Sequence, residues 1–192
     1  MAVSLTKGQH APLAQGLNQI LVTLGWQERK DSNEKFDLDA SCFLLGENGK
    51  VRSSRDFVYY KQKDSWGDAI VYGGDVKRGG ADCETFKIDL SQIPADVAKL
   101  VFVVTIYKGR QKYQNFGMLE SAFINIVDVA VDDAIAQFYL TADASKEIAV
   151  IFGELYRKNG AWRFRALGEG FNSNDPNCRH ELQALARHYG AL

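Results

Sequence analysis

Cysteine is scarce in this sequence, and the three residues that occur, Cys42, Cys83 and Cys178, are widely spaced. An odd number of scattered cysteines argues against a disulfide framework and favours a reducing compartment. Histidine is equally rare, with three residues, and the common motifs of nucleophilic, phosphate-binding and zinc-dependent enzymes are absent. These absences predict a non-enzymatic protein of the cytoplasm.

The sequence also lacks an excess of either charge and any long apolar run. Its net charge is −1 and its pI is about 6.3, so no global positive field would attract nucleic acid or an anionic membrane surface. No run approaches the length of a membrane-spanning helix, and residues 1–26 lack the basic and then apolar pattern of a signal peptide. We therefore expect no nucleic-acid partner and no transmembrane segment.

Short runs rich in β-branched and aromatic residues recur along the chain, separated by Gly, Asn, Asp and Pro. Such runs are typical of strands. We expect strands at residues 20–26, 36–45, 56–60, 69–74, 84–90, 100–107, 122–128, 135–140, 147–157 and 161–168. This pattern predicts an all-β fold, an antiparallel β-sandwich, in which the nearly continuous apolar run at 100–107 is a central strand.

Turn and helix signals complete the expected fold. Asn-Gly pairs at 48–49 and 159–160 predict two hairpin turns. Leu182, Leu185 and Tyr189 recur at helical spacing ahead of Gly190, which predicts a short C-terminal helix. Because the sequence has no fixed-period repeat and no long linker, we expect a single domain over residues 1–192.

Acidic residues concentrate between residues 37 and 84. In the expected strand at 36–45, the even-numbered residues from Phe36 to Leu44 are apolar or small, so Asp37 and Asp39 must share the opposite face. The glycine-rich segment 73–84 carries Asp75, Asp82 and Glu84, and we expect it to be a loop that could bend around a hard cation.

Calcium suits such a segment better than magnesium, because it accepts six to eight oxygen ligands in flexible geometry. The ordinary interpretation is that these carboxylates serve solubility and turn formation, and the residues alone favour it. No run of the EF-hand type is present.

Several longer motifs resemble the TerD family of tellurite-resistance and stress proteins, and the resemblance runs nearly from end to end. They are MAVSLTKG at 1–8, VTLGW at 22–26, FDLDASCFLL at 36–45, GKVRSSRDFVYY at 49–60, LVFVVTIY at 100–107, QNFGMLESAFINIVD at 114–128, FGELYRKNGAWRFRALGEGF at 152–171 and RHYG at 187–190.

The resemblance implies a β-sandwich that binds calcium through the DLD segment and the acidic glycine-rich loop. With Asp68 added, the candidate metal ligands are Asp37, Asp39, Asp68, Asp75, Asp82 and Glu84. It also implies a non-catalytic part in tellurite resistance, general stress response or phage defence. The implied partners are other proteins of such a multiprotein system, with peripheral association to membrane-bound partners.

The acidic loop departs from the family pattern. It is two residues shorter, Val76 replaces an asparagine, Lys77 and Arg78 add positive charge, and Cys83 replaces a carboxylate, while Lys61 adds a further cation after the aromatic strand. Since ligand charge tunes calcium affinity, we expect one or two calcium ions bound more weakly than is typical of the family. The alternative is a metal-independent interaction or scaffold module whose calcium site is degenerate.

Two enzymatic or reactive alternatives have less support. Cys83 stands between Asp82 and Glu84, and flanking carboxylates disfavour the thiolate form that a reactive cysteine needs. Paired carboxylates could serve glycoside hydrolysis, but the sequence indicates no substrate.

Overall fold

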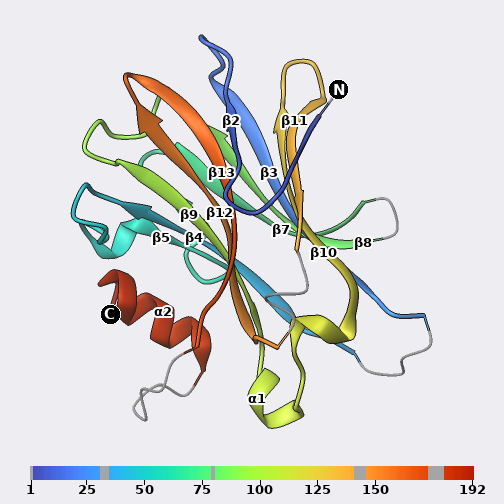
Figure 1. The fold of residues 1–192 in the computed structure, drawn as a ribbon. Coiled ribbons are helices and arrows are strands. Elements are labelled where there is room, and N and C mark those ends of the chain that lie inside the picture. The colour runs from blue at the N-terminus through green and yellow to red at the C-terminus, as the bar shows by residue number, and fades with distance from the viewer. Residues whose placement is uncertain (1, 31–34, 79–80, 141–145, 173–179) are drawn as a thin grey trace.

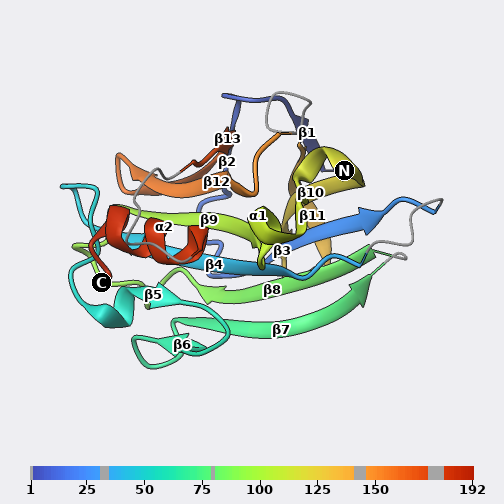
Figure 2. The same cartoon turned by 90° about the horizontal axis from the view of Figure 1, so that it is seen from below.

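The computed structural model describes residues 2–30, 35–78, 81–140, 146–172 and 180–192, with the backbone alone at 75–78 and 81–82. Two β-sheets pack face to face and enclose the main apolar core (Figure 1). A C-terminal helix covers part of the outer face of one sheet (Figure 2). The predicted all-β sandwich with a short C-terminal helix is confirmed.

Sheet A has seven strands in the order β1-β11-β10-β3-β8-β7-β6. These strands are β1 (Val3–Leu5), β3 (Gln19–Glu28), β6 (Asp64–Ser65), β7 (Ile70–Arg78), β8 (Ala81–Asp89), β10 (Leu119–Asp128) and β11 (Asp133–Tyr139). Neighbours are antiparallel except β1 and β11, which pair in parallel.

Sheet B has six antiparallel strands in the order β2-β13-β12-β9-β4-β5. They are β2 (His10–Pro12), β4 (Leu38–Leu45), β5 (Phe57–Val58), β9 (Lys99–Ile106), β12 (Ala149–Lys158) and β13 (Ala161–Gly170). The helical segments are η1 (Ser54–Asp56), α1 (Gly109–Lys112), η2 (Phe116–Met118) and α2 (Glu181–Tyr189).

Every expected run contains a strand. The sequence missed three further strands and one parallel pairing. Strands β1, β2 and β6 were not expected, because two or three residues are too few to show a period. Strand β1 lies parallel to β11, a pairing that the distance between them in the sequence hides.

Strand β9 is internal to sheet B, as its apolar run predicted. Its even-numbered residues, such as Phe102 and Val104, join the core between the sheets. Val101 and Val103 instead join a second apolar cluster on the outer face, which α2 covers. The run lacks polar alternation because both faces of the strand are buried.

Helix α2 has the predicted apolar stripe, since Leu182, Leu185 and Tyr189 all pack into the outer cluster. It ends at Gly190, whose φ of 80° is left-handed and suits glycine. Its N-cap is His180, whose Nδ1 accepts a hydrogen bond from the backbone N–H of Gln183 at 3.2 Å.

The Asn159-Gly160 pair forms the predicted tight turn between β12 and β13, with both residues at positive φ (53° and 77°). The turn at 46–50 also forms, closed by a hydrogen bond from Gly46 N to the Lys50 oxygen at 2.9 Å. It does not join two strands directly, because η1 lies between it and β5.

The segment from Arg52 to Trp66 is fixed by one buried carboxylate. Asp56 accepts hydrogen bonds from the Arg52 guanidinium at 2.8 and 2.9 Å and from the Trp66 indole N–H at 2.6 Å. The Arg52 guanidinium also lies 4.7 Å from the Trp66 ring. Asp56, one of the acidic residues of the sequence cluster, is therefore structural.

Replacing Asp56 with Ala is expected to lower the free energy of unfolding by about 3 kcal/mol, because Arg52 and Trp66 would lose their buried acceptor. Urea unfolding followed by circular dichroism measures this loss. Asp96→Ala is the control: Asp96 also contacts Arg52, but its side chain is 73% exposed, so the expected loss is below about 1 kcal/mol. Equal losses in the two variants would contradict the assignment.

The stabilisation by Asp56 should depend on pH. Burial by itself would raise the pKa of Asp56, but hydrogen bonds from Arg52 and Trp66 outweigh it and lower the pKa. The stabilisation of the folded protein by Asp56 is therefore fully present above the pKa of this carboxyl in the unfolded chain, about 3.9. It is lost as pH falls through the lower pKa of the folded state. In urea titrations, the difference in stability between the unmodified protein and Asp56→Asn should shrink below about pH 4.

Candidate metal centre

Strand β4 has the two faces that its alternation predicted. Leu38, Ala40 and the other even-numbered residues of the strand lie in the core between the sheets. Asp39 is half-buried and lies opposite Thr105 of β9. Asp37 is exposed just before the strand, and its backbone oxygen accepts a hydrogen bond from Tyr107 N at 2.7 Å.

Glu84 is the acidic residue that links the two sheets. It lies on β8 of sheet A, and its side chain is only 2% exposed. One carboxylate oxygen accepts a hydrogen bond from the backbone N–H of Ala40 in sheet B at 2.6 Å. This contact brings the Glu84 carboxylate to the backbone of β4, one residue from Asp39.

The pairing of β4 explains why a side chain is needed there. Strand β5 pairs with β4 only at Cys42 and Phe43. Residues two apart in a strand direct their backbone N–H groups to the same edge, so the N–H of Ala40 points to the edge of β4 at which Cys42 pairs with β5. It lies beyond the end of that pairing. A buried N–H without an acceptor is costly, and Glu84 supplies the acceptor from the other sheet.

The expectation of a glycine-rich loop at 73–84 was wrong over most of its length. Strand β7 continues to Arg78 and β8 begins at Ala81, so the segment is mainly a strand hairpin, with residues 79–80 outside the described part. A bulge between Tyr72 and Gly74 bends β7, and Gly74 has a left-handed φ of 72°. Strand β8 pairs with β3 as far as Asp82, and this pairing extends it beyond the predicted run at 84–90.

The backbone register brings two further candidates near Glu84. Asp75 lies directly opposite Glu84 on β7, and Asp82 lies two residues from Glu84 on β8, opposite Trp26 of β3. The side chains of Asp75 and Asp82 lie outside the described part of the structure.

Asp68 does not lie near Glu84. It is exposed in a turn before β7, with a φ of 66°. Ile70, at that end of β7, pairs with Ile88, whereas Asp75 pairs with Glu84. At roughly 3.3 Å per strand residue, Asp68 lies at the other end of the hairpin from Glu84.

The described candidate ligands near the contact between β4 and β8 are carboxylates. Cys83 is buried, and because successive strand residues face opposite sides, its thiol and the Glu84 carboxylate point apart. Among the described side chains, no three His, Cys, Asp or Glu residues come close enough to hold a metal ion. The described part of the site is Asp39 and Glu84, and these hard donors fit calcium better than a soft metal.

Asp39 also lies in a cleft that the sequence did not reveal. The cleft is lined by Tyr60, by Thr105 of β9 and Tyr107 just after it, and by His180 and Glu181 at the start of α2. Glu181 forms an ion pair with Arg110 of α1 at 2.8 Å. No sequence pattern joins Asp39 to residues 180–181, because only the packing of α2 brings them together.

Lys61 is exposed, and its ammonium nitrogen lies 5.5 Å from the centroid of the Tyr60 ring. The histidines also have structural neighbours. His10 is hydrogen-bonded to the Tyr156 hydroxyl at 2.8 Å, and His188 packs against Phe171 and Tyr189.

Two sheets packed face to face, with a helix on the outer face of one, define a β-sandwich domain. The TerD domain family matches residues 1–189. The chain therefore belongs to the TerD family, as its motifs predicted. No helix in the described ranges has the length and apolar character that crossing a membrane requires.

Relatives link the chain to tellurium resistance and stress proteins. It is 45% identical over 176 residues to tellurium resistance protein TerD of Alcaligenes sp, with 89% of this chain and 92% of the relative covered. It is 39% identical over 196 residues to general stress protein 16U of Bacillus subtilis (strain 168), with 99% and 98% covered.

A solved structure supports the fold. The crystal structure of a homologue of telluride resistance protein TerD from Streptomyces coelicolor A3(2) matches with a TM-score of 0.60. The sequence identity is 17%, and the match covers 87% of this chain and 98% of that one. At this identity the likeness shows the fold alone.

Glu84→Ala is expected to lower the free energy of unfolding by about 2 kcal/mol, because the Ala40 N–H would lose its buried acceptor. Glu84→Gln is the matched variant, since its amide oxygen can still accept that hydrogen bond, and it should lose less. Urea unfolding of both variants in EDTA measures the effect without metal. Equal stability of Glu84→Ala and the unmodified protein would show that the bond is dispensable.

Proposed function

We infer that this TerD-family protein is a non-catalytic calcium-binding component of a tellurium-resistance or stress-response system in the cytoplasm. The observation that carries the proposal is the buried Glu84 carboxylate, which reaches across from sheet A to the backbone of β4 beside Asp39. Burying a carboxylate is costly, and a nearby dication offsets both the burial and the repulsion between neighbouring carboxylates.

The residues that would hold calcium are Asp39 and Glu84, with Asp37, Asp75 and Asp82 as the further members of the set. Calcium bound there would neutralise the carboxylates and hold β4 of sheet B to β8 of sheet A. It would thereby stabilise the folded domain and change the charge of the surface offered to a partner. The partners we propose are other proteins of the same system, including membrane-bound ones.

The metal-independent scaffold remains the second candidate, and one observation favours it. The register sets Lys77 opposite Asp82 in the β7–β8 hairpin. Directly opposed residues of unlike charge stabilise antiparallel strands, so this hairpin has a candidate counter-charge without a metal ion. The two candidates differ in whether the fold responds to calcium.

Thermal unfolding distinguishes the two functions. Calcium added to EDTA-treated protein is expected to raise the melting temperature by about 5–10 °C when its concentration exceeds the dissociation constant a hundredfold. Magnesium at the same concentrations should have a smaller effect. Differential scanning fluorimetry across a calcium titration gives the measurement.

Three variants locate the ion in the same titration. Asp39→Asn and Glu84→Gln remove a charged ligand while keeping size and hydrogen-bond acceptors, so they should abolish the calcium shift. Asp68→Asn should keep it, because Asp68 lies at the other end of the hairpin. No shift at millimolar calcium would overturn the calcium proposal and leave the scaffold function.

A further inference from the structure

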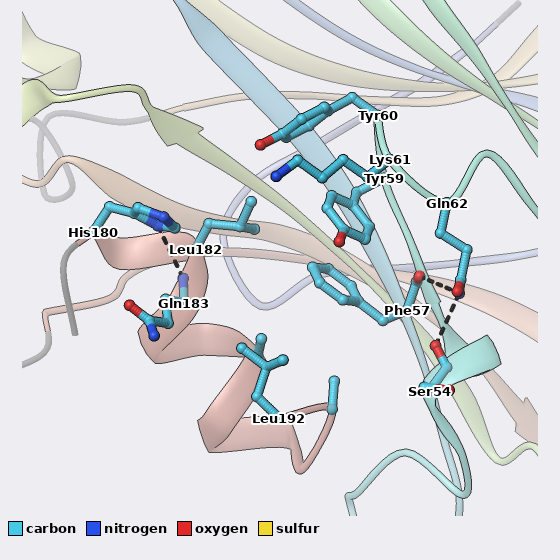
Figure 3. A pocket seen from close by; sticks show the side chains of 12 residues that line it. Ser54, Phe57, Tyr59, Tyr60, Lys61, Gln62, His180, Leu182, Gln183 and Leu192 are labelled. Atoms are coloured by element: carbon cyan, nitrogen blue, oxygen red, sulfur yellow. Dashed lines mark hydrogen bonds between the residues drawn. The ribbon is translucent and has the colours of Figure 1, made fainter. Parts of the chain in front are cut away.

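A groove separates α2 from the segment around β5, and none of the features discussed so far uses it. Its volume is about 630 Å³, within the range of roughly 300–1,000 Å³ in which proteins hold small molecules. Residues 54–62 line one side and residues 180–192 the other (Figure 3). Tyr60, His180 and Leu182 also line the cleft that contains Asp39, so the two spaces adjoin.

The side of the groove formed by β5 is aromatic and ordered as a stack. The rings of Phe43 and Phe57 lie 4.4 Å apart and almost parallel, and Phe57 and Tyr59 repeat this arrangement at 4.2 Å. Tyr60 stands edge-on to Tyr59 at 5.2 Å and is 40% exposed. Phe57, Tyr59 and Tyr60 all line the groove, so a planar ring would find parallel and perpendicular aromatic partners.

The aromatic side is held in place before any ligand arrives. The side-chain amide of Gln62 donates hydrogen bonds to the backbone oxygens of Ser54 and Phe57 at 2.8 and 2.7 Å. Tyr59 and Gln62 also exchange two backbone hydrogen bonds, which close a tight turn with Tyr60 and Lys61 at its tip (Figure 3). A fixed binding surface loses little entropy when a ligand binds.

The charges around the groove favour an anion. Among the described residues that line the groove none is acidic, whereas Lys61 is exposed at the tip of the turn and lies over the Tyr60 ring. The positive end of the nine-residue helix α2 lies on the opposite side, at His180. In the adjoining cleft, Glu181 is paired with Arg110, and Asp39 is the other carboxylate.

We propose that this groove binds a small planar aromatic carboxylate, with its ring against Tyr59 and Tyr60 and its charge beside Lys61. The site is distinct from the calcium ligands, and binding there does not depend on calcium. It gives this protein a small-molecule ligand class in addition to its proposed metal.

The probe is 2-naphthoate, with the neutral 2-naphthalenemethanol as its matched analogue, both titrated in EDTA so that the calcium proposal is tested separately. Chemical-shift mapping by ¹H–¹⁵N NMR should place the naphthoate at residues 57–62 and 182–186. The expected dissociation constant is on the order of 1 mM, and the alcohol should bind several-fold more weakly.

Two pairs of variants test the assignment of roles. Lys61→Gln should weaken naphthoate binding about five-fold and leave the alcohol unchanged, whereas Lys87→Gln, an exposed lysine on sheet A, should change neither. Tyr60→Ala should weaken both ligands roughly three- to ten-fold, whereas Tyr139→Ala, of similar exposure on β11, should have no effect.

Each of three results would overturn the proposal: no shift at residues 57–62 with 5 mM naphthoate, equal affinity for naphthoate and the alcohol, or no effect of Lys61→Gln. All four substituted side chains are exposed, so the variants should fold, and their melting temperatures in EDTA check this.

Discussion

The outer face of sheet B is apolar and must be covered, and this constraint shapes most of the functional surface. Phe43, Val101 and Val103 point away from the inter-sheet core and would meet water without α2. Covering them contributes hydrophobic stabilisation of roughly 1.5–3 kcal/mol for each fully buried side chain. Because α2 covers only part of the face, it leaves the groove beside Phe57 and the cleft at Asp39.

The contact between Glu84 and β4 ties the candidate metal centre to the architecture itself. A short β5 leaves the Ala40 N–H without a strand partner, and a carboxylate from the opposite sheet satisfies it. The same carboxylate then lies at the backbone of β4, one residue from Asp39, and a cation bound there would reduce the cost of its burial. The structural role of Glu84 and its proposed metal-binding role therefore fall on the same carboxylate, and only a variant that keeps the acceptor and loses the charge separates them.

The sequence predicted best where a local period determines the structure. Alternation in FDLDASCFLL placed Ala40 inside and Asp39 outside, and helical spacing identified the buried side of α2 at Leu185 and Tyr189. It failed where pairing between strands decides, as at 73–84, where β7 pairs with β8 as far as Arg78 and β8 also pairs with β3 from Asp82 onward. The cleft at Asp39 was equally hidden, because its lining residues come from segments far apart in the sequence, around residues 39, 60, 105–107 and 180–182.

Acidic composition alone is a poor guide to the site, because the clustered carboxylates have different environments. Asp56 is buried, and its two carboxylate oxygens accept four hydrogen bonds from Arg52 and Trp66, so their acceptor sites are already filled. Asp68 lies at the far end of the hairpin. Glu84 differs from both, because its carboxylate reaches the backbone of β4 one residue from Asp39. Position relative to the open edge of β4, rather than the density of charge along the sequence, therefore separates candidate ligands from structural acids.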